Sequence, residues 1–117
     1  MGSAGMAGHL ITTYFEEQGK YTVTDISRSR KLREQSRLID ACKIQNLETF
    51  LDGKNFDVII NCIGILNRQG DLHPDQAILL NAFLPHFLEE KYRNSSTKVI
   101  QLSTDCVFSG KIGHYTE

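Results

Sequence analysis

Hydrophobic side chains recur at two spacings along this chain, and the change from one spacing to the other predicts its helices and strands. Over residues 6–18 the apolar residues stand three and four positions apart, which is the pattern of a helix with one apolar face. Gly19 follows and suits a helix end, because glycine readily adopts the left-handed conformation there. Residues 21–27 are rich in β-branched side chains and predict a strand.

The middle of the chain repeats this alternation. A polar helix or a loop is predicted over 31–37, and a short strand over 38–41. The apolar spacing around 47–51 predicts a second amphipathic helix that ends at Gly53. Residues 56–65, FDVIINCIGI, are apolar at almost every position, as a central parallel strand covered on both faces requires.

The last third predicts a loop over 63–74, a long helix over 76–92 and a final strand over 98–103. Pro85 lies inside the long helix. A proline there removes a backbone hydrogen bond and costs about 3 kcal/mol unless the helix adapts. A bend or break is therefore predicted near Leu84.

Helices and strands in alternation predict βαβ units and a parallel sheet. The expected fold class is α/β, a Rossmann-type doubly wound sheet, forming one dinucleotide-binding domain over residues 1–117. The sheet is expected to be incomplete. A strand ordinarily precedes the glycine-rich turn of such a fold, and here only Met1 precedes it.

Composition and charge narrow the class of protein. Hydrophobic residues make up 40% and charged residues 23% of the chain, as in ordinary globular proteins. The formal net charge of -1 gives no basis for binding nucleic acid or an anionic membrane. No apolar run reaches the length of about 18 residues that a bilayer requires. Three cysteines without CxxC spacing indicate neither a disulfide framework nor a zinc site, and a reduced, cytoplasmic protein is expected.

A glycine motif opens the first predicted helix. Gly2, Gly5 and Gly8 form a GxxGxxG pattern, with Met6 and Ala7 inside it. A tight turn at a helix N-terminus lets a pyrophosphate approach free backbone N–H groups, and the helix dipole favours the anion. A flexible N-terminus is the alternative interpretation of the same glycines.

The end of the strand predicted over 21–27 bears on the choice of cofactor. Dinucleotide folds place there an acidic residue for a ribose hydroxyl, or an arginine for a 2′-phosphate. Ser27 and Arg28 stand at the expected tip, which favours NADP, while Asp25 stands slightly earlier and leaves NAD open. A solvated surface charge is the alternative for Arg28.

Polar residues follow the two most apolar strands. Residues 61–65 would lie along the cofactor, since ligands bind beyond the carboxyl ends of parallel strands. Ser103, Thr104 and Asp105 are expected on the same rim, where a hydroxyl could stabilise negative charge developing on a carbonyl. Strand-end capping is the alternative there.

Two other kinds of site find little support. Asp71, His73 and Asp75 superficially suggest a metal cluster, but the stretch is better explained as a loop that ends at Pro74. No GxSxG elbow supports a serine nucleophile.

Four segments in this order, GSAGMAGHLI, DVIINCIGI, Asn81-Ala82 and LSTDCVFSGKIGHYTE, resemble the extended short-chain dehydrogenase/reductases. The similarity is greatest to the dTDP-4-dehydrorhamnose reductase group and related nucleotide-sugar reductases. The tail is the most specific part, because family members carry S-T-D-x-V-F-x-G followed shortly by Y-x-E.

The resemblance implies a cofactor site and a catalytic residue. Thr104 matches the family's catalytic hydroxyl, which helps to hold the 4-keto group of a nucleotide sugar for hydride delivery. The cofactor would be NADP, with NAD open. Its implied neighbours are Gly2, Gly5, Met6, Ala7, Gly8, Ser27, Arg28, Asp40, Ala41, Cys62, Ile63 and Gly64.

The resemblance also implies parts that this sequence does not contain. The family's catalytic Tyr-x-x-x-Lys would follow Glu117, and the substrate domain is absent, so the chain is expected to be an N-terminal portion that does not turn over alone. Its expected partner is a nucleotide-sugar substrate, and a homodimer is compatible with the fold. A non-catalytic nucleotide-binding subunit and a related epimerase or dehydratase are the alternatives.

Overall fold

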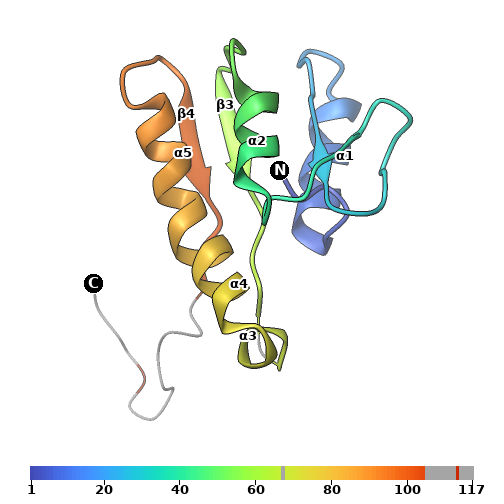
Figure 1. Ribbon diagram of the computed structural model, residues 1–117. Helices are drawn as coiled ribbons and strands as arrows, with labels where there is room; N and C mark the ends of the chain where they lie inside the picture. Colours follow the sequence, from blue (N-terminus) through green and yellow to red (C-terminus); the bar gives the residue numbers. More distant parts are fainter. Residues whose placement is uncertain (67, 105–112, 114–117) are drawn as a thin grey trace.

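Parallel strands arranged in two separate pairs form the centre of the molecule in a computed structural model, which describes residues 1–66, 68–104 and 113 (Figure 1). Strand β1 (Ile26–Ser27) pairs with β2 (Arg37–Leu38). Strand β3 (Val58–Asn61) pairs with β4 (Lys98–Gln101) in the register Val58 to Lys98 through Asn61 to Gln101. Each pair is parallel, as the alternation of helices and strands predicts.

Met1 lies between the two strand pairs and hydrogen-bonds to one of them directly. Its amino nitrogen donates to the carbonyl of Ile60 at 2.6 Å, and the amide of Cys62 donates to the carbonyl of Met1 at 3.1 Å. On the other side, the amide of Gly2 donates to the carbonyl of Ile26 at 2.9 Å. The first two residues thus occupy the position of a central strand, and the N-terminus is seen there in Figure 1.

Two helices form over the residues where the apolar spacing predicts them, but in the first of them Met6, Leu10 and Tyr14 are 93%, 70% and 55% exposed, so its apolar face is not the buried one. Helix α1 (Met6–Glu17) is followed by Gly19 with a φ of 64°, and α2 (Ile44–Leu51) is followed by Gly53 with a φ of 68°. Both glycines therefore adopt the left-handed conformation expected past a helix end. The segment over 31–37, for which a helix or a loop was open, contains no helix.

The long helix adapts to its proline without breaking. Helix α4 (Pro74–Ile78), the π-helical segment η1 (Leu79–Phe83) and α5 (Leu84–Tyr92) follow one another without a gap. The amide of Leu84 donates to the carbonyl of Leu79, five residues earlier. This wider turn immediately precedes Pro85, whose nitrogen has no hydrogen to donate. The predicted irregularity near Leu84 is therefore present, and it takes the form of a π-turn.

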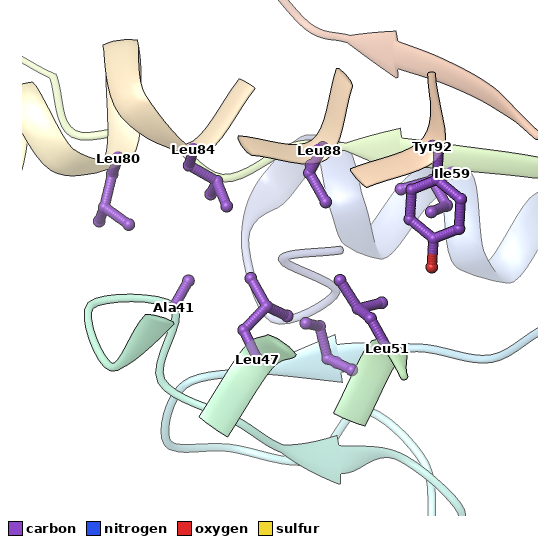
Figure 2. Close-up of a cluster of buried hydrophobic side chains, with 9 residues drawn as sticks. Ala41, Leu47, Leu51, Ile59, Leu80, Leu84, Leu88 and Tyr92 are labelled. Atoms are coloured by element: carbon purple, nitrogen blue, oxygen red, sulfur yellow. The ribbon is translucent and has the colours of Figure 1, made fainter. Parts of the chain in front are cut away.

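Leucines at four-residue spacing on this long helix form one side of the hydrophobic core. Figure 2 shows them in a row, facing Ala41 and the apolar side of α2. The buried cluster comprises Ile26, Ala41, Leu47, Leu51, Ile59, Leu80, Leu84, Leu88 and Tyr92. Helices α2 and α5 thus cover the same face of the strands.

The strands are shorter than their sequences predict. The predicted ranges 21–27, 38–41, 56–65 and 98–103 correspond to β1, β2, β3 and β4 of two to four residues each. Val58 is 44% exposed, so β3 is not the fully covered strand that its composition indicates. Among the described residues, β3 pairs with a strand only on the β4 side, and on its other side Met1 alone bonds to it. The predicted loop over 63–74 contains the short helix α3 (Arg68–Leu72).

Candidate functional site

A cavity of about 410 Å³ lies at the carboxyl ends of the strands. Three segments that are far apart in the sequence form most of it: the glycine turn, the tip after β1 and the residues after β3. Its described lining consists of Gly2, Ala4, Gly5, Ser27, Arg28, Ser29, Ile39, Asp40, Ala41, Cys62, Ile63, Gly64, Ile65, Leu66, Gln69, Gln76 and Leu80. Its size is that of a small-molecule or cofactor site.

The glycine turn is closed by its own backbone. Gly2 has a φ of 80°, which L-residues rarely adopt, and its carbonyl accepts from the amide of Gly5 at 3.0 Å. A Cβ on Gly8 would stand 2.1 Å from the Gly2 oxygen, so only glycine allows α1 to pack this closely on the turn. Gly2 and Gly5 therefore face the cavity, while Gly8 supports the turn from behind.

A buried ion pair ties this turn to β1. The Ser3 hydroxyl donates to Asp25 Oδ2 at 2.6 Å, and Arg33 donates to Asp25 Oδ1 from Nη2 at 2.6 Å and from Nε at 3.1 Å. Arg33 also pairs with Glu16 of α1. Asp25 is buried, and both of its oxygens have partners. It therefore contacts the turn rather than a ribose, so that its sequence position gives no support for NAD.

Two arginines stand near the tip after β1 in different roles. Arg28 is exposed and lines the cavity, together with Ser27 and Ser29. Arg30 Nη2 donates to the carbonyl of Ala4 at 3.3 Å, and the Ser27 hydroxyl donates to the carbonyl of Arg30. The tip is thereby joined to the glycine turn, and Arg28 remains as the cation on the cavity wall.

Asp40 and Ala41 form the next part of the wall. Asp40 Oδ1 accepts from the amide of Cys42 at 3.0 Å, and its carbonyl accepts from the amide of Lys43 at 2.9 Å, which makes a compact turn before α2. Burial, followed by the neighbouring Asp40 carboxylate, raises the pKa of the Cys42 thiol. Cys42 is therefore a neutral packing residue near neutral pH.

The segment after β3 is held in place by two asparagines. Asn61 Oδ1 accepts from the amide of Ile63 at 3.2 Å, and its Nδ2 donates to Gln101 Oε1 of β4 at 2.6 Å. Asn81 of η1 exchanges two bonds with the backbone of Ile65, at 2.8 and 2.7 Å. The two asparagine side chains thus position Cys62, Ile63 and Gly64 so that they line the cavity. The asparagines themselves are not among the lining residues.

Cys62 lines the cavity but is not activated as a nucleophile. Burial raises the pKa of its thiol, and the nearby Met1 ammonium only partly opposes this effect. A thiol with a raised pKa is protonated near neutral pH, and the thiolate is the reactive form. Cys62 therefore contributes shape to the site rather than chemistry.

The structure brings together most of the residues that the resemblance implies for a cofactor. Those lining the cavity are Gly2, Gly5, Ser27, Arg28, Asp40, Ala41, Cys62, Ile63 and Gly64. Met6, Ala7 and Gly8 do not line it, and Met6 is 93% exposed. Ile65 also lines the cavity, as expected for residues 61–65, whereas the sequence did not point to Ala4, Ser29, Ile39, Leu66, Gln69, Gln76 and Leu80. The last four belong to the segment after β3 and the long helix, which carry no motif of their own.

The structure describes only part of the segment for which a catalytic role is predicted. Thr104 is exposed just beyond β4 and is not among the lining residues. Asp105, the rest of the S-T-D-x-V-F-x-G segment to Gly110, and Tyr115 and Glu117 lie outside the described residues, as does Asn67.

The cavity wall fits a dinucleotide phosphate. The first N–H groups of a helix lack intrahelical partners, and the first turn of α1 contains no acidic residue that would repel an anion. Gly5 is extended at the helix start, with a φ of -81°, and its missing side chain leaves this end of α1 open. A neutral glycine turn and one exposed arginine are what an anionic cofactor requires here.

Two other classes of site have no support in the described part of the chain. No three His, Cys, Asp or Glu side chains there are grouped so that they could hold a metal ion. Within the same residues, no helix combines the length and the hydropathy that crossing a bilayer would take.

Comparison with known proteins identifies one family. The profile of the NAD dependent epimerase/dehydratase family matches residues 1–116. A search of curated proteins found no match, and neither did a search of solved structures. The match spans both the glycine turn and the segment after β4, so it includes every wall of the cavity.

Proposed function

The chain belongs to the NAD dependent epimerase/dehydratase family, and from this premise we propose that it is the cofactor-binding part of an NADP(H)-dependent nucleotide-sugar 4-keto reductase. The family has a Rossmann-like α/β fold and depends on NAD(P). The observation that carries the proposal is the convergence of the glycine turn, Arg28 and the 62–64 segment on one cavity.

Each wall of the cavity has a distinct role in this proposal. The N-terminus of α1, opened by Gly2 and Gly5, binds the pyrophosphate. Arg28 contributes a permanent positive charge and planar N–H donors to bind the 2′-phosphate of NADP. Asp40 and Ala41 lie beside the adenine, and Cys62, Ile63 and Gly64 follow the cofactor toward its reactive end.

When bound, the nicotinamide supplies a hydride for a keto carbon of the sugar. The role of this chain is to orient the nicotinamide and to hold the keto carbonyl of the sugar. Thr104 follows β4, whose neighbour β3 leads to the 62–64 segment. Its hydroxyl would donate to the 4-keto oxygen and favour the negative charge that develops there.

The proton donor of the reaction is a tyrosine whose pKa a lysine lowers, in a Tyr-x-x-x-Lys pair. Tyr14, Tyr21 and Tyr92 are followed four positions later by Gln18, Asp25 and Ser96, so none of them forms this pair. We therefore expect residues 1–117 to bind the cofactor without reducing a sugar by themselves.

A related epimerase or dehydratase is the second candidate, because the family includes both. The S-T-D sequence at 103–105 favours the reductase group. A nucleotide sugar is the proposed substrate, and a non-catalytic nucleotide-binding subunit is the third interpretation.

A binding titration tests the proposal. NADPH fluorescence should saturate with the 117-residue chain, and Gly5→Asp should abolish the signal because a carboxylate then faces the pyrophosphate. Leu10→Asp is the matched control, since Leu10 is 70% exposed on the same helix and is not among the lining residues. Equal affinity in the wild-type chain and Gly5→Asp would contradict the pyrophosphate assignment.

A further inference from the structure

Gln76 is the polar end of the leucine row on the long helix. Leu80, Leu84, Leu88 and Tyr92 are buried at four-residue spacing and form one side of the core. Gln76 stands four residues before the first of them, on α4, and lines the 410 Å³ cavity. Because side chains four residues apart share one face of a helix, an amide takes the place of an apolar side chain where the row reaches the cavity.

The side chain of Gln76 is half-buried, and its hydrogen-bonding groups have no partner among the described residues. A glutamine amide carries one acceptor oxygen and a nitrogen with two hydrogens to donate. Such groups are usually paired when they are buried. Gln69 is the other glutamine among the described lining residues, and it is exposed on α3. Gln76 is therefore the better placed of the two amides to bond to a molecule that fills the cavity.

The core packing places Gln76 beside the wall that Ala41 forms. Figure 2 shows Leu80 and Leu84 on the side of the core that faces Ala41. Both Ala41 and Leu80 line the cavity. Gln76 is one helical turn from Leu80, so its amide borders the same end of the cavity as Ala41.

The charges around Cys42 give the same placement. After burial and Asp40, the charges of Arg28 and Asp75 also shift the pKa of the Cys42 thiol, Arg28 downward and Asp75 upward. The start of α4 and the tip after β1 therefore both lie within electrostatic reach of Cys42. Gln76 directly follows Asp75, so it belongs to the end of the cavity that Arg28 lines.

Apolar side chains accompany the amide at this end of the cavity. Ile39, Ala41 and Leu80 line it, and apolar surface of this kind suits the flat faces of a base. A glutamine amide pairs with adenine through two bonds, in which its oxygen accepts from the N6 amino group and its nitrogen donates to N7. Hypoxanthine has an oxygen in place of that amino group, so one of the two bonds is lost.

We propose that Gln76 selects adenine as the base of the coenzyme, with its side-chain oxygen accepting from N6 and its side-chain nitrogen donating to N7. The inference rests on the proposed function, since it assigns the base of a dinucleotide whose phosphates are bound by the glycine turn and Arg28. It adds a specificity-determining residue from the long helix, which carries none of the sequence motifs of the site.

Three coenzymes test the two bonds on the unaltered 117-residue chain. They are NADPH, its analogue with hypoxanthine in place of adenine, and its analogue with 7-deazaadenine, which lacks the N7 acceptor. Nicotinamide fluorescence gives the dissociation constant of each. Both analogues should bind about fivefold more weakly than NADPH or worse, because each loses one hydrogen bond of the pair. Affinity equal to that of NADPH for either analogue would overturn the proposal.

Two variants then assign the preference to a residue. Gln76→Met keeps the length of the side chain and a good helix former but removes the amide, so the three dissociation constants should come within about twofold of one another. Gln69→Met is the matched control, since it removes the other glutamine amide of the cavity wall, and it should keep the preference for NADPH. A preference kept in Gln76→Met, or lost in Gln69→Met, would overturn the assignment.

The same titrations separate this inference from the proposed function. Failure of the unaltered chain to bind NADPH at all would contradict the proposed function, and the role of Gln76 with it. Tight binding of all three coenzymes with equal affinity would leave a dinucleotide site in place and overturn only the recognition of adenine by Gln76. The comparison on the unaltered chain decides this even if a variant is unstable.

Discussion

The Ser3 hydroxyl donates a 2.6 Å hydrogen bond to the carboxylate of Asp25, which joins the glycine turn to the strand beside it. Arg33 holds the other oxygen of that carboxylate and pairs with Glu16 on α1. The turn is thus positioned by a charge network as well as by its glycines. Since none of these side chains lines the cavity, their effect on a cofactor would be indirect.

Removal of Arg33 should destabilise the fold. Arg33→Ala leaves the buried Asp25 carboxylate with only the Ser3 hydroxyl and should lower the free energy of unfolding by about 3 kcal/mol. Arg37→Ala, on the exposed strand β2, should change it by less than about 0.5 kcal/mol. Urea denaturation of both variants measures the difference, and equal stability of the two would show that the network contributes nothing.

Gly8 should tolerate no side chain. Gly8→Ala places a methyl group 2.1 Å from the Gly2 oxygen, so the backbone must move, at a cost of about 1–3 kcal/mol. Gly70→Ala is the matched control, because its Cβ would meet neighbours at ordinary contact distances of 3.7 and 3.9 Å. Thermal unfolding of both compares them, and a Gly8→Ala midpoint equal to that of Gly70→Ala would refute the close packing.

The hydroxyl of Tyr92 should be dispensable. It is buried and has no hydrogen-bond partner among the described residues, and burial raises its pKa. Tyr92→Phe removes an unsatisfied polar group and should leave stability unchanged or increase it by up to about 1 kcal/mol. Tyr21→Phe, at an exposed ring, serves as the control. A loss of more than about 1 kcal/mol in Tyr92→Phe alone would mean that the hydroxyl has a partner.

The stability of the 117-residue chain should rise with pH as the solution approaches pH 8. Burial lowers the pKa of the Met1 ammonium from its ordinary 8.0, and the nearby Cys62 and Asp25 oppose this only in part. The unfolded chain therefore binds more protons in the window below pH 8.0, so stability increases through that window and is fully present above it. Below the pKa that the Met1 ammonium has in the folded chain, this gain in stability is absent.

Urea denaturation between pH 6 and pH 8.5 measures this dependence, in a range below the ordinary Cys pKa of 9.0. Acetylation of Met1 keeps an N–H for Ile60 and removes the charge, so this contribution to the rise should disappear. An identical pH profile before and after acetylation would exclude the N-terminus as its source.

Helix α2 and the long helix could be predicted from the sequence because each buries the leucines of one side. The leucine row on the long helix meets α2 directly, and Gly19 and Gly53 end their helices in the expected conformation. Strand lengths could not be predicted in this way. β-branched residues at 21–25 favour a strand, but a strand also needs neighbours. In the part of the chain that the structure describes, only Met1 and Gly2 bond to β1 and β3 on the sides that face each other.

In the candidate site, too, some features could be predicted from the sequence and others could not. The glycine turn and the tip at Arg28 have local motifs, and both line the cavity. The roles of Asp25 and Asn81 do not follow from local sequence. Asp25 is bound by Ser3, 22 residues earlier, and Asn81 holds the backbone of Ile65, 16 residues earlier. Contacts at such separations depend on how the elements pack, which no spacing rule contains.

Coenzyme preference should depend on Arg28. Arg28→Ala should weaken NADPH binding by about tenfold or more and leave NADH binding nearly unchanged, since only NADPH carries the 2′-phosphate. Arg37→Ala, which removes an exposed arginine outside the cavity, is the control. Isothermal titration with both coenzymes gives the ratio, and an equal loss for NADPH and NADH in Arg28→Ala would contradict the assignment.

Amide chemical shifts during an NADPH titration test the central claim most directly. We predict that saturable changes gather at the glycine turn, at Arg28 and at Ile63, while Lys54 and Lys98 on other parts of the surface stay unchanged. Gly5→Asp should abolish the changes. Shifts spread evenly over the protein, or none at NADPH concentrations near 1 mM, would contradict a dinucleotide site in this cavity.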